Sequence, residues 1–149
     1  MIAVDTNLLV YAHREDSPWH DPALAKIKEL AEAKSPWAIP WPCIHEFLAV
    51  VTHPRIYSPP TPLSAAIDQV EAWFESPSLV LLAETEAYWG ELRAALEHGQ
   101  VGGPQVHDGR VAALCRDHVR TAQAVLKPLE IRSNSRCARF SGGIANLKT

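Results

Sequence analysis

Short apolar runs alternate along the chain with segments in which apolar residues recur at helical spacing. An apolar run bounded by turn residues predicts a buried strand, and recurrence at every third or fourth position predicts an amphipathic helix. The predicted strands are Met1–Val4, Trp37–Ile39 and Leu79–Ala83. Because these strands alternate with helices, the pattern predicts an α/β fold with a parallel sheet.

Six helices are predicted around these strands. Asp21 and Pro22 form a favourable N-cap and first-position pair, and Gly99 ends a helix that Thr85 caps. The helix that starts at Thr61-Pro62 places apolar residues on one face, at positions 63, 67, 70 and 74. The remaining helices are expected at Leu8–His13, Cys43–Thr52 and about Val106–His118.

Length and composition indicate one soluble globular domain. The 149 residues suffice for a substantial core, and 47% apolar and 21% charged residues are ordinary fractions. The longest apolar runs, such as Phe47–Val51, are too short to cross a membrane, and no secretory signal is expected at the N-terminus. Cys43, Cys115 and Cys137 are scattered and odd in number, which fits a reducing cytoplasm and argues against disulfides or a zinc site.

The charge changes sign near the end of the chain. Residues 1–119 carry 8 Lys and Arg against 16 Asp and Glu, a balance of −8, whereas residues 120–149 carry 6 against 1, a balance of +5. The overall charge of −3 shows no basic footprint for nucleic acid. Acids gathered at a metal site would help to mask such a footprint.

Asp5 follows the first predicted strand, in the tripeptide Asp5-Thr6-Asn7. Ligands of open α/β sheets bind outside the carboxyl ends of the strands, so an acid at this position is well placed for function. The alternative is that Asp5 or Thr6 only caps the next helix. The tripeptide alone favours neither interpretation.

Glu46 shares a predicted helical face with Cys43 and Val50. A carboxylate in such a stripe needs a metal, a partner or a position at the helix edge, because an unpaired buried charge is costly. The alternative is an ion pair with a basic side chain such as Arg55. The local sequence alone slightly favours that ion pair.

Asp108 begins the apolar face of its predicted helix, because Val111, Ala112 and Cys115 follow at helical spacing. The alternative is a capping role, since the helix macrodipole favours Asp near a helix start. His107 is a candidate substrate or supporting contact, although a lone His at a helix start is more often a surface residue.

Three acids thus sit at the start, or on the inner face, of three core-facing elements. Their oxygens suit Mg²⁺ or Mn²⁺, and a cation is needed to keep close carboxylates ionised together. Such a site can activate water and stabilise a leaving oxygen. We therefore expect Asp5, Glu46 and Asp108 to converge on one divalent metal that hydrolyses phosphodiester bonds.

In this order the three motifs resemble those of the PIN-domain ribonucleases, and most of all the VapC toxins of bacterial toxin–antitoxin pairs. The resemblance covers roughly residues 1–118. The three motifs are Val-Asp-Thr-Asn-Leu-Leu-Val-Tyr-Ala around Asp5, His45-Glu46-Phe47 with the following Thr-His-Pro-Arg, and Val-His-Asp-Gly-Arg-Val-Ala-Ala-Leu around Asp108.

The resemblance implies a small α/β/α sandwich around a parallel sheet and Mg²⁺- or Mn²⁺-dependent endonucleolytic cleavage of RNA. It makes Asp5, Glu46 and Asp108 the catalytic metal ligands, with Thr6, Asn7 and His107 as substrate or supporting contacts. The implied partners are RNA, a cognate antitoxin that blocks the acidic pocket, and a second copy of the chain in a homodimer.

The resemblance ends near residue 119. The family pattern continues with a strand and a fourth acidic motif, whereas residues 119–149 form a divergent basic tail in which Glu130 has no matching context. We hypothesise a reading-frame shift near codon 120; the alternative is a genuine divergent tail, partly disordered. In both cases the terminal strand is expected to be missing or altered.

The missing fourth acid keeps other functions open. A catalytically impaired PIN-fold module would bind an antitoxin or RNA without cleaving it. Another metal phosphohydrolase, acting on a small phosphoester, would need a closed pocket in place of an RNA groove.

Overall fold

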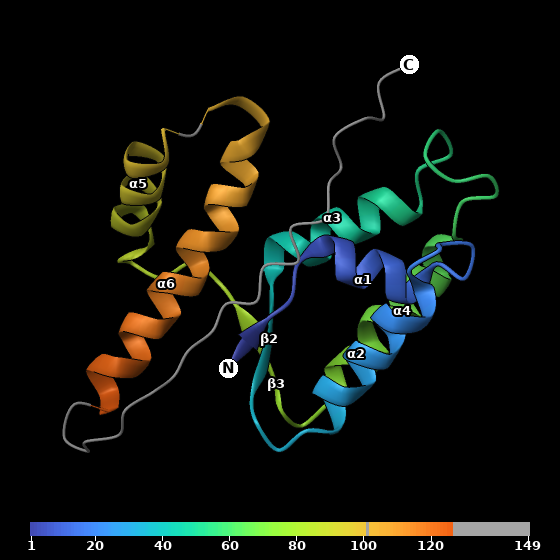
Figure 1. The fold of residues 1–149 in the computed structure, drawn as a ribbon, viewed down its shortest axis with the longest axis horizontal. Helices are drawn as coiled ribbons and strands as arrows, with labels where there is room; N and C mark the ends of the chain where they lie inside the picture. Colours follow the sequence, from blue (N-terminus) through green and yellow to red (C-terminus); the bar gives the residue numbers. More distant parts are fainter. Residues whose placement is uncertain (101, 127–149) are drawn as a thin grey trace.

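Three short parallel strands form the centre of the fold in the computed structural model, which describes residues 1–100 and 102–126. They are β1 (Ile2–Ala3), β2 (Trp37–Pro40) and β3 (Leu79–Leu82), in the order β1-β2-β3. Trp37 of β2 pairs with Ile2 on one side and with Leu79 on the other. The predicted α/β class with a parallel sheet is therefore confirmed, and the three carboxyl ends lie at one edge of the sheet (Figure 1).

Helices cover the sheet from two sides (Figure 1). One layer holds the first four helices, and the other holds the hairpin of the last two helices, which agrees with the expected PIN-like sandwich. The first layer comprises α1 (Thr6–His13), α2 (His20–Glu32), α3 (Trp41–Val51) and α4 (Leu63–Phe74), and the second comprises α5 (Tyr88–Gly99), the 3₁₀ turn η1 (Gly103–Gln105) and α6 (Val106–Leu126).

The main core lies between the sheet and helices α1 to α4. Alternate residues of a strand point to opposite faces, and Trp37 and Ile39 enter this core. Ala38 and Pro40, on the opposite face, are equally buried, as expected for a strand covered on both sides. Phe47 of α3 packs edge-on against Trp73 of α4, with ring centroids 4.8 Å apart.

Helix α6 is held to the chain segment that follows β3 by three polar contacts. The Thr85 hydroxyl donates to the carboxylate of Asp117, which is 1% exposed, and lies 2.9 Å from Oδ1 and 2.8 Å from Oδ2. His118 Nε2 donates to the Ala83 carbonyl at 2.8 Å, and the third contact is an ion pair described below with the site. These contacts fix where α6 can lie relative to the sheet.

Helices α5 and α6 pack closely against each other. Tyr88, Ala113 and Leu114 form a second small apolar cluster with Leu92. A Cβ atom added to Gly109 would approach the Leu96 side chain to 3.0 Å, so the absence of a side chain at residue 109 permits the close approach.

The helix starts differ from those predicted. Helix α2 begins at His20 with Trp19 as N-cap, so Asp21 lies inside the first turn and is not the cap. Helix α5 begins at Tyr88 with Ala87 as N-cap. Thr85, three residues before the first residue of the helix, instead accepts a hydrogen bond from the Ala87 amide at 3.1 Å.

The buried face of α4 also differs from the prediction. Ala66, Val70 and Trp73 are buried, whereas Ile67 and Phe74 are 43% and 40% exposed. The sequence offers apolar residues on both faces of α4, and the contact between Trp73 and Phe47 determines that the face with Trp73 is buried.

Helix α6 continues to Leu126, beyond the predicted end at His118. Residues 127–149, which hold most of the predicted divergent tail, lie outside the described residues, so the tail and the frame shift stay hypotheses. Within the described ranges, no helix has the length and apolar character needed to cross a membrane.

We expect the Asp117→Ala variant to lose about 2–3 kcal/mol of unfolding free energy, because the exchange removes charge-assisted hydrogen bonds made by a buried carboxylate. Urea denaturation followed by circular dichroism would measure the loss. Asp68→Ala on the exposed face of α4 is the matched control and should stay within about 0.5 kcal/mol of the parent chain. Equal stability of the two variants would show that α6 does not depend on Asp117.

Candidate active site

Asp5 stands between β1 and α1 and caps the helix. Its backbone is extended, and Oδ1 accepts a hydrogen bond from the Leu8 amide at 3.0 Å. The capping role that the sequence offered as an alternative is thus present in the structure. It engages one carboxylate oxygen and is compatible with a second role for the other.

Thr6 connects the first motif to the second. Its hydroxyl, on a residue 8% exposed, donates to Glu46 Oε2 at 2.6 Å. The hydrogen bond joins the first residue of α1 to the middle of α3, across 40 positions of sequence. Glu46 therefore accepts a hydroxyl proton and, within the described residues, makes no ion pair with Arg55, the partner suggested as the alternative.

The surroundings of Cys43 indicate that the carboxylates of Asp5 and Glu46 lie close together. It lies one turn before Glu46 on α3 and is 1% exposed. Burial raises the pKa of its thiol to about 11; a hydrogen bond with Thr6 opposes the rise, and the negative charges of Asp5 and Glu46 add to it. Asp5, Thr6, Cys43 and Glu46 thus form one cluster at the carboxyl edge of the sheet, which we call the Asp5–Glu46 cluster.

Asp108 lies in the first turn of α6 and is exposed. Val111, one turn later, packs against the main core, as the sequence predicted for this face of the helix. Over residues 106–119 of α6, the buried positions are instead Gly109, Ala113, Leu114 and Asp117. Asp108 therefore begins a half-buried face, next to the buried stripe.

The three acids do not form one metal-binding group within residues 1–100 and 102–126. No set of three or more His, Cys, Asp and Glu side chains is arranged there to hold a metal ion. Their convergence on one metal stays a prediction. Asn7 lies half-buried beside the cluster on α1, and His107 is exposed beside Asp108, so their roles as substrate contacts also stay predictions.

The donor set of the Asp5–Glu46 cluster nevertheless fits a hard divalent cation. Mg²⁺ is commonly held by one or two carboxylates, with water and substrate phosphate completing its shell. Asp5 and Glu46 supply two carboxylates, and the Thr6 hydroxyl fixes the position of one of them. That this cluster holds magnesium or manganese stays a prediction.

Sequence reasoning missed residues that matter for this architecture. Asp117 looks like an ordinary surface acid of a helix, and its partner Thr85 is 32 positions away. The only signal was the spacing of Gly109, Ala113 and Asp117 at intervals of four, which places them on one helix face.

A small parallel sheet between two helical layers, with carboxylates at its carboxyl edge, is the architecture of PIN-domain proteins that the motifs predicted. No family model matches the chain. Among curated proteins, ribonuclease VapC43 of Mycobacterium tuberculosis is 30% identical over 121 residues, which cover 81% of this chain and 82% of the relative. Ribonuclease VapC37 of the same organism is 30% identical over 79% of this chain and 82% of the relative, and ribonuclease VapC48 is 27% identical over 76% and 79%. The chain therefore belongs to the VapC family of PIN-domain toxins, as its motifs predicted.

Two substitutions at Asp5 should separate its capping role from its charge. Asp5→Ala removes the cap and should lower the unfolding free energy by about 1 kcal/mol. Asp5→Asn keeps a side-chain oxygen that is equally good at an N-cap, so its stability should stay close to that of the parent chain. Urea denaturation of both variants would measure the difference, and an Asp5→Asn loss as large as that of Asp5→Ala would contradict the capping assignment.

Proposed function

We propose that the chain is a Mg²⁺- or Mn²⁺-dependent endoribonuclease, the toxin of a toxin–antitoxin pair. The observation that supports this most directly is the Asp5–Glu46 cluster, at the carboxyl edge of a parallel sheet, in a chain that covers most of the length of VapC ribonucleases. Substrates of open α/β folds bind at this edge.

In this proposal Asp5 and Glu46 hold the metal, which when bound supplies an activated water and neutralises charge on the phosphodiester. Thr6 is a positioning residue, because its hydroxyl holds Glu46 Oε2 at 2.6 Å. Asp108 is the proposed third ligand, and Asn7 and His107 are proposed substrate contacts. RNA, an antitoxin protein and a second copy of the chain are the proposed partners, and the cytoplasm is the proposed compartment.

A second candidate function has an observation in its favour. Because the described residues hold no three-acid group, the chain fits a catalytically impaired module that binds an antitoxin or RNA without cleaving it. Metal-dependent cleavage distinguishes the two candidates directly.

We expect the purified chain to cleave structured RNA when Mn²⁺ or Mg²⁺ is present and to stop when EDTA is added. Asp5→Asn and Glu46→Gln should each lower the cleavage rate by about 100-fold or more, since even groups that only orient metal ligands contribute 10- to 100-fold. Thr6→Val should lower the cleavage rate by about 10- to 100-fold, because Thr6 only orients Glu46. Cleavage would be followed on labelled RNA by denaturing gel electrophoresis.

Asp68→Asn, which removes an exposed acid on α4, is the matched control and should cleave RNA at the parent rate. Cleavage that survives EDTA or Asp5→Asn would contradict the metal proposal. A folded chain that cleaves no RNA but binds an antitoxin would support the second candidate.

The role of Asp108 can be tested without activity. A metal that binds only the folded chain raises its stability by mass action, so Mn²⁺ should raise the Tm of the parent chain and not that of Asp5→Asn or Glu46→Gln. If Asp108 is a ligand, Asp108→Asn should lose most of the Mn²⁺-dependent rise in a thermal melt. A full Mn²⁺ response in Asp108→Asn would leave the site to Asp5 and Glu46 alone.

A further inference from the structure

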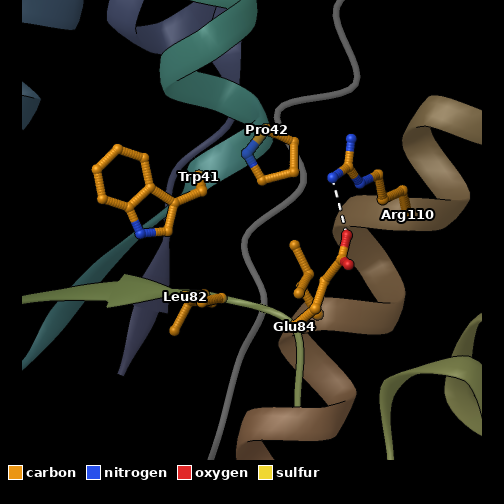
Figure 2. Close-up of a pocket in the computed structure, with 7 residues that line it drawn as sticks. Trp41, Pro42, Leu82, Glu84 and Arg110 are labelled. Carbon is orange, nitrogen blue, oxygen red and sulfur yellow. Dashed lines mark hydrogen bonds and ion pairs between the residues drawn. The ribbon is translucent and has the colours of Figure 1, made fainter. Parts of the chain in front are cut away.

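A groove opens at the same edge of the sheet as the Asp5–Glu46 cluster. It has a volume of about 230 Å³ and lies between the start of α3, the segment after β3 and α6 (Figure 2). Neighbouring strands are about 4.8 Å apart, so the end of β3 lies roughly 10 Å from the end of β1, which precedes Asp5. Pro42, at the wall of the groove, is four residues before Glu46 and shares its helix face.

The groove has an apolar floor and a charged mouth. Pro42, Leu82 and Leu114 contribute apolar surface. At the mouth, Arg110 of α6 and Glu84 face each other, with Arg110 Nη2 2.8 Å from Glu84 Oε1 (Figure 2). An apolar surface beside a guanidinium suits a nucleotide, because the base or ribose needs apolar contact and the phosphate needs a cation.

A phosphate can readily replace Glu84 as the partner of Arg110 at the mouth of the groove. The side chains of Arg110 and Glu84 are 40% and 48% exposed, and exposed ion pairs contribute little to stability. A guanidinium matches a phosphate with two parallel hydrogen bonds, at least as well as it matches a carboxylate. A phosphate entering the groove can therefore take Arg110 from Glu84 at small cost.

A buried hydroxyl lies close to this ion pair. Tyr88 packs against Leu114, a groove residue, and is 8% exposed. Burial raises the pKa of Tyr88; the charge of Glu84 adds to the rise, and the charge of Arg110 and a hydrogen bond with its side chain oppose it. Arg110 therefore lies within reach of both Glu84 and Tyr88.

We infer that this groove holds one nucleotide of the RNA substrate beside the scissile bond, with its phosphate on Arg110, and that Glu84 competes with the phosphate for Arg110. The inference rests on the proposed function. RNA is favoured over an acidic peptide because the groove shares its edge of the sheet, and one wall, with the Asp5–Glu46 cluster. Glu84 thereby lowers the affinity for RNA, and its removal should raise that affinity.

The test uses the full chain and a short, labelled single-stranded RNA of mixed sequence, with EDTA present so that no metal-dependent cleavage occurs. Fluorescence anisotropy at several salt concentrations gives the Kd and its salt dependence. Arg110→Gln should weaken binding by about tenfold and reduce the slope of log K against log salt by about 0.7, the value for one phosphate contact on a single strand. Arg110→Lys should restore the slope, because it keeps the charge.

Glu84→Gln is the matched variant and should act in the opposite direction. It removes the competitor, so binding should tighten about two- to fivefold, the range that an exposed ion pair allows, with an unchanged salt slope. A merely structural ion pair predicts that both variants lose the same interaction and shift affinity together. Urea denaturation of both variants would show that each is folded.

Shifts of the two variants in the same direction, or no shift in either, would overturn the inference. Unchanged RNA affinity combined with weaker binding of an acidic peptide by Arg110→Gln would overturn it in favour of a protein partner. If the parent chain cleaves RNA and Arg110→Gln binds it normally, the inference fails and the proposed function stands. Opposite shifts in RNA binding without metal-dependent cleavage would keep Arg110 as a phosphate contact for RNA, but would refute the enzyme proposal and with it the position beside a scissile bond. A parent chain that neither binds nor cleaves RNA would refute both.

Discussion

The hydrogen bonds between Asp117 and Thr85 determine where the second helical layer lies. A carboxyl group that is 1% exposed needs polar partners, and the Thr85 hydroxyl supplies one for Asp117 of α6. The position of α5 depends in turn on that of α6, because Gly109 of α6 permits close packing against Leu96 of α5. The groove at the carboxyl edge lies between α3, α6 and the segment after β3, so its shape depends on how α6 is held there.

The Asp5–Glu46 cluster shows how one set of atoms serves both stability and chemistry. Asp5 accepts a hydrogen bond from the amide of Leu8, and Glu46 accepts one from the hydroxyl of Thr6. Both carboxylates are therefore held in place by hydrogen bonds within the chain. Side chains that are already held in place lose little conformational entropy when a ligand binds. The sequence offered capping and metal binding as alternatives for Asp5, but one carboxylate has two oxygens and can do both.

Local sequence predicted what depends on neighbouring residues, and failed where distant contacts decide. The strand at Leu79 and the helix start beside Asp5 follow from apolar runs and turn residues. The face of α4 does not, because Ile67 and Trp73 are equally acceptable until Phe47 of α3 packs against Trp73. The partners of Asp117 and Glu46 likewise come from segments 32 and 40 positions away, and no periodicity along a single helix identifies them.

The position of Asp108 follows from the same attachment of α6. The first turns of α6 lie on the side of the carboxyl ends of the strands (Figure 1), and Arg110, two residues later, lines the groove there. Asp108, in the first turn of α6, therefore lies towards the same edge of the sheet. However, the contacts from Arg110, Asp117 and His118 all end on the segment Ala83–Thr85 after β3, while Asp5 follows β1 at the opposite end of the order β1-β2-β3. The interactions that anchor α6 to the segment after β3 therefore also set the position of Asp108 relative to Asp5 and Glu46.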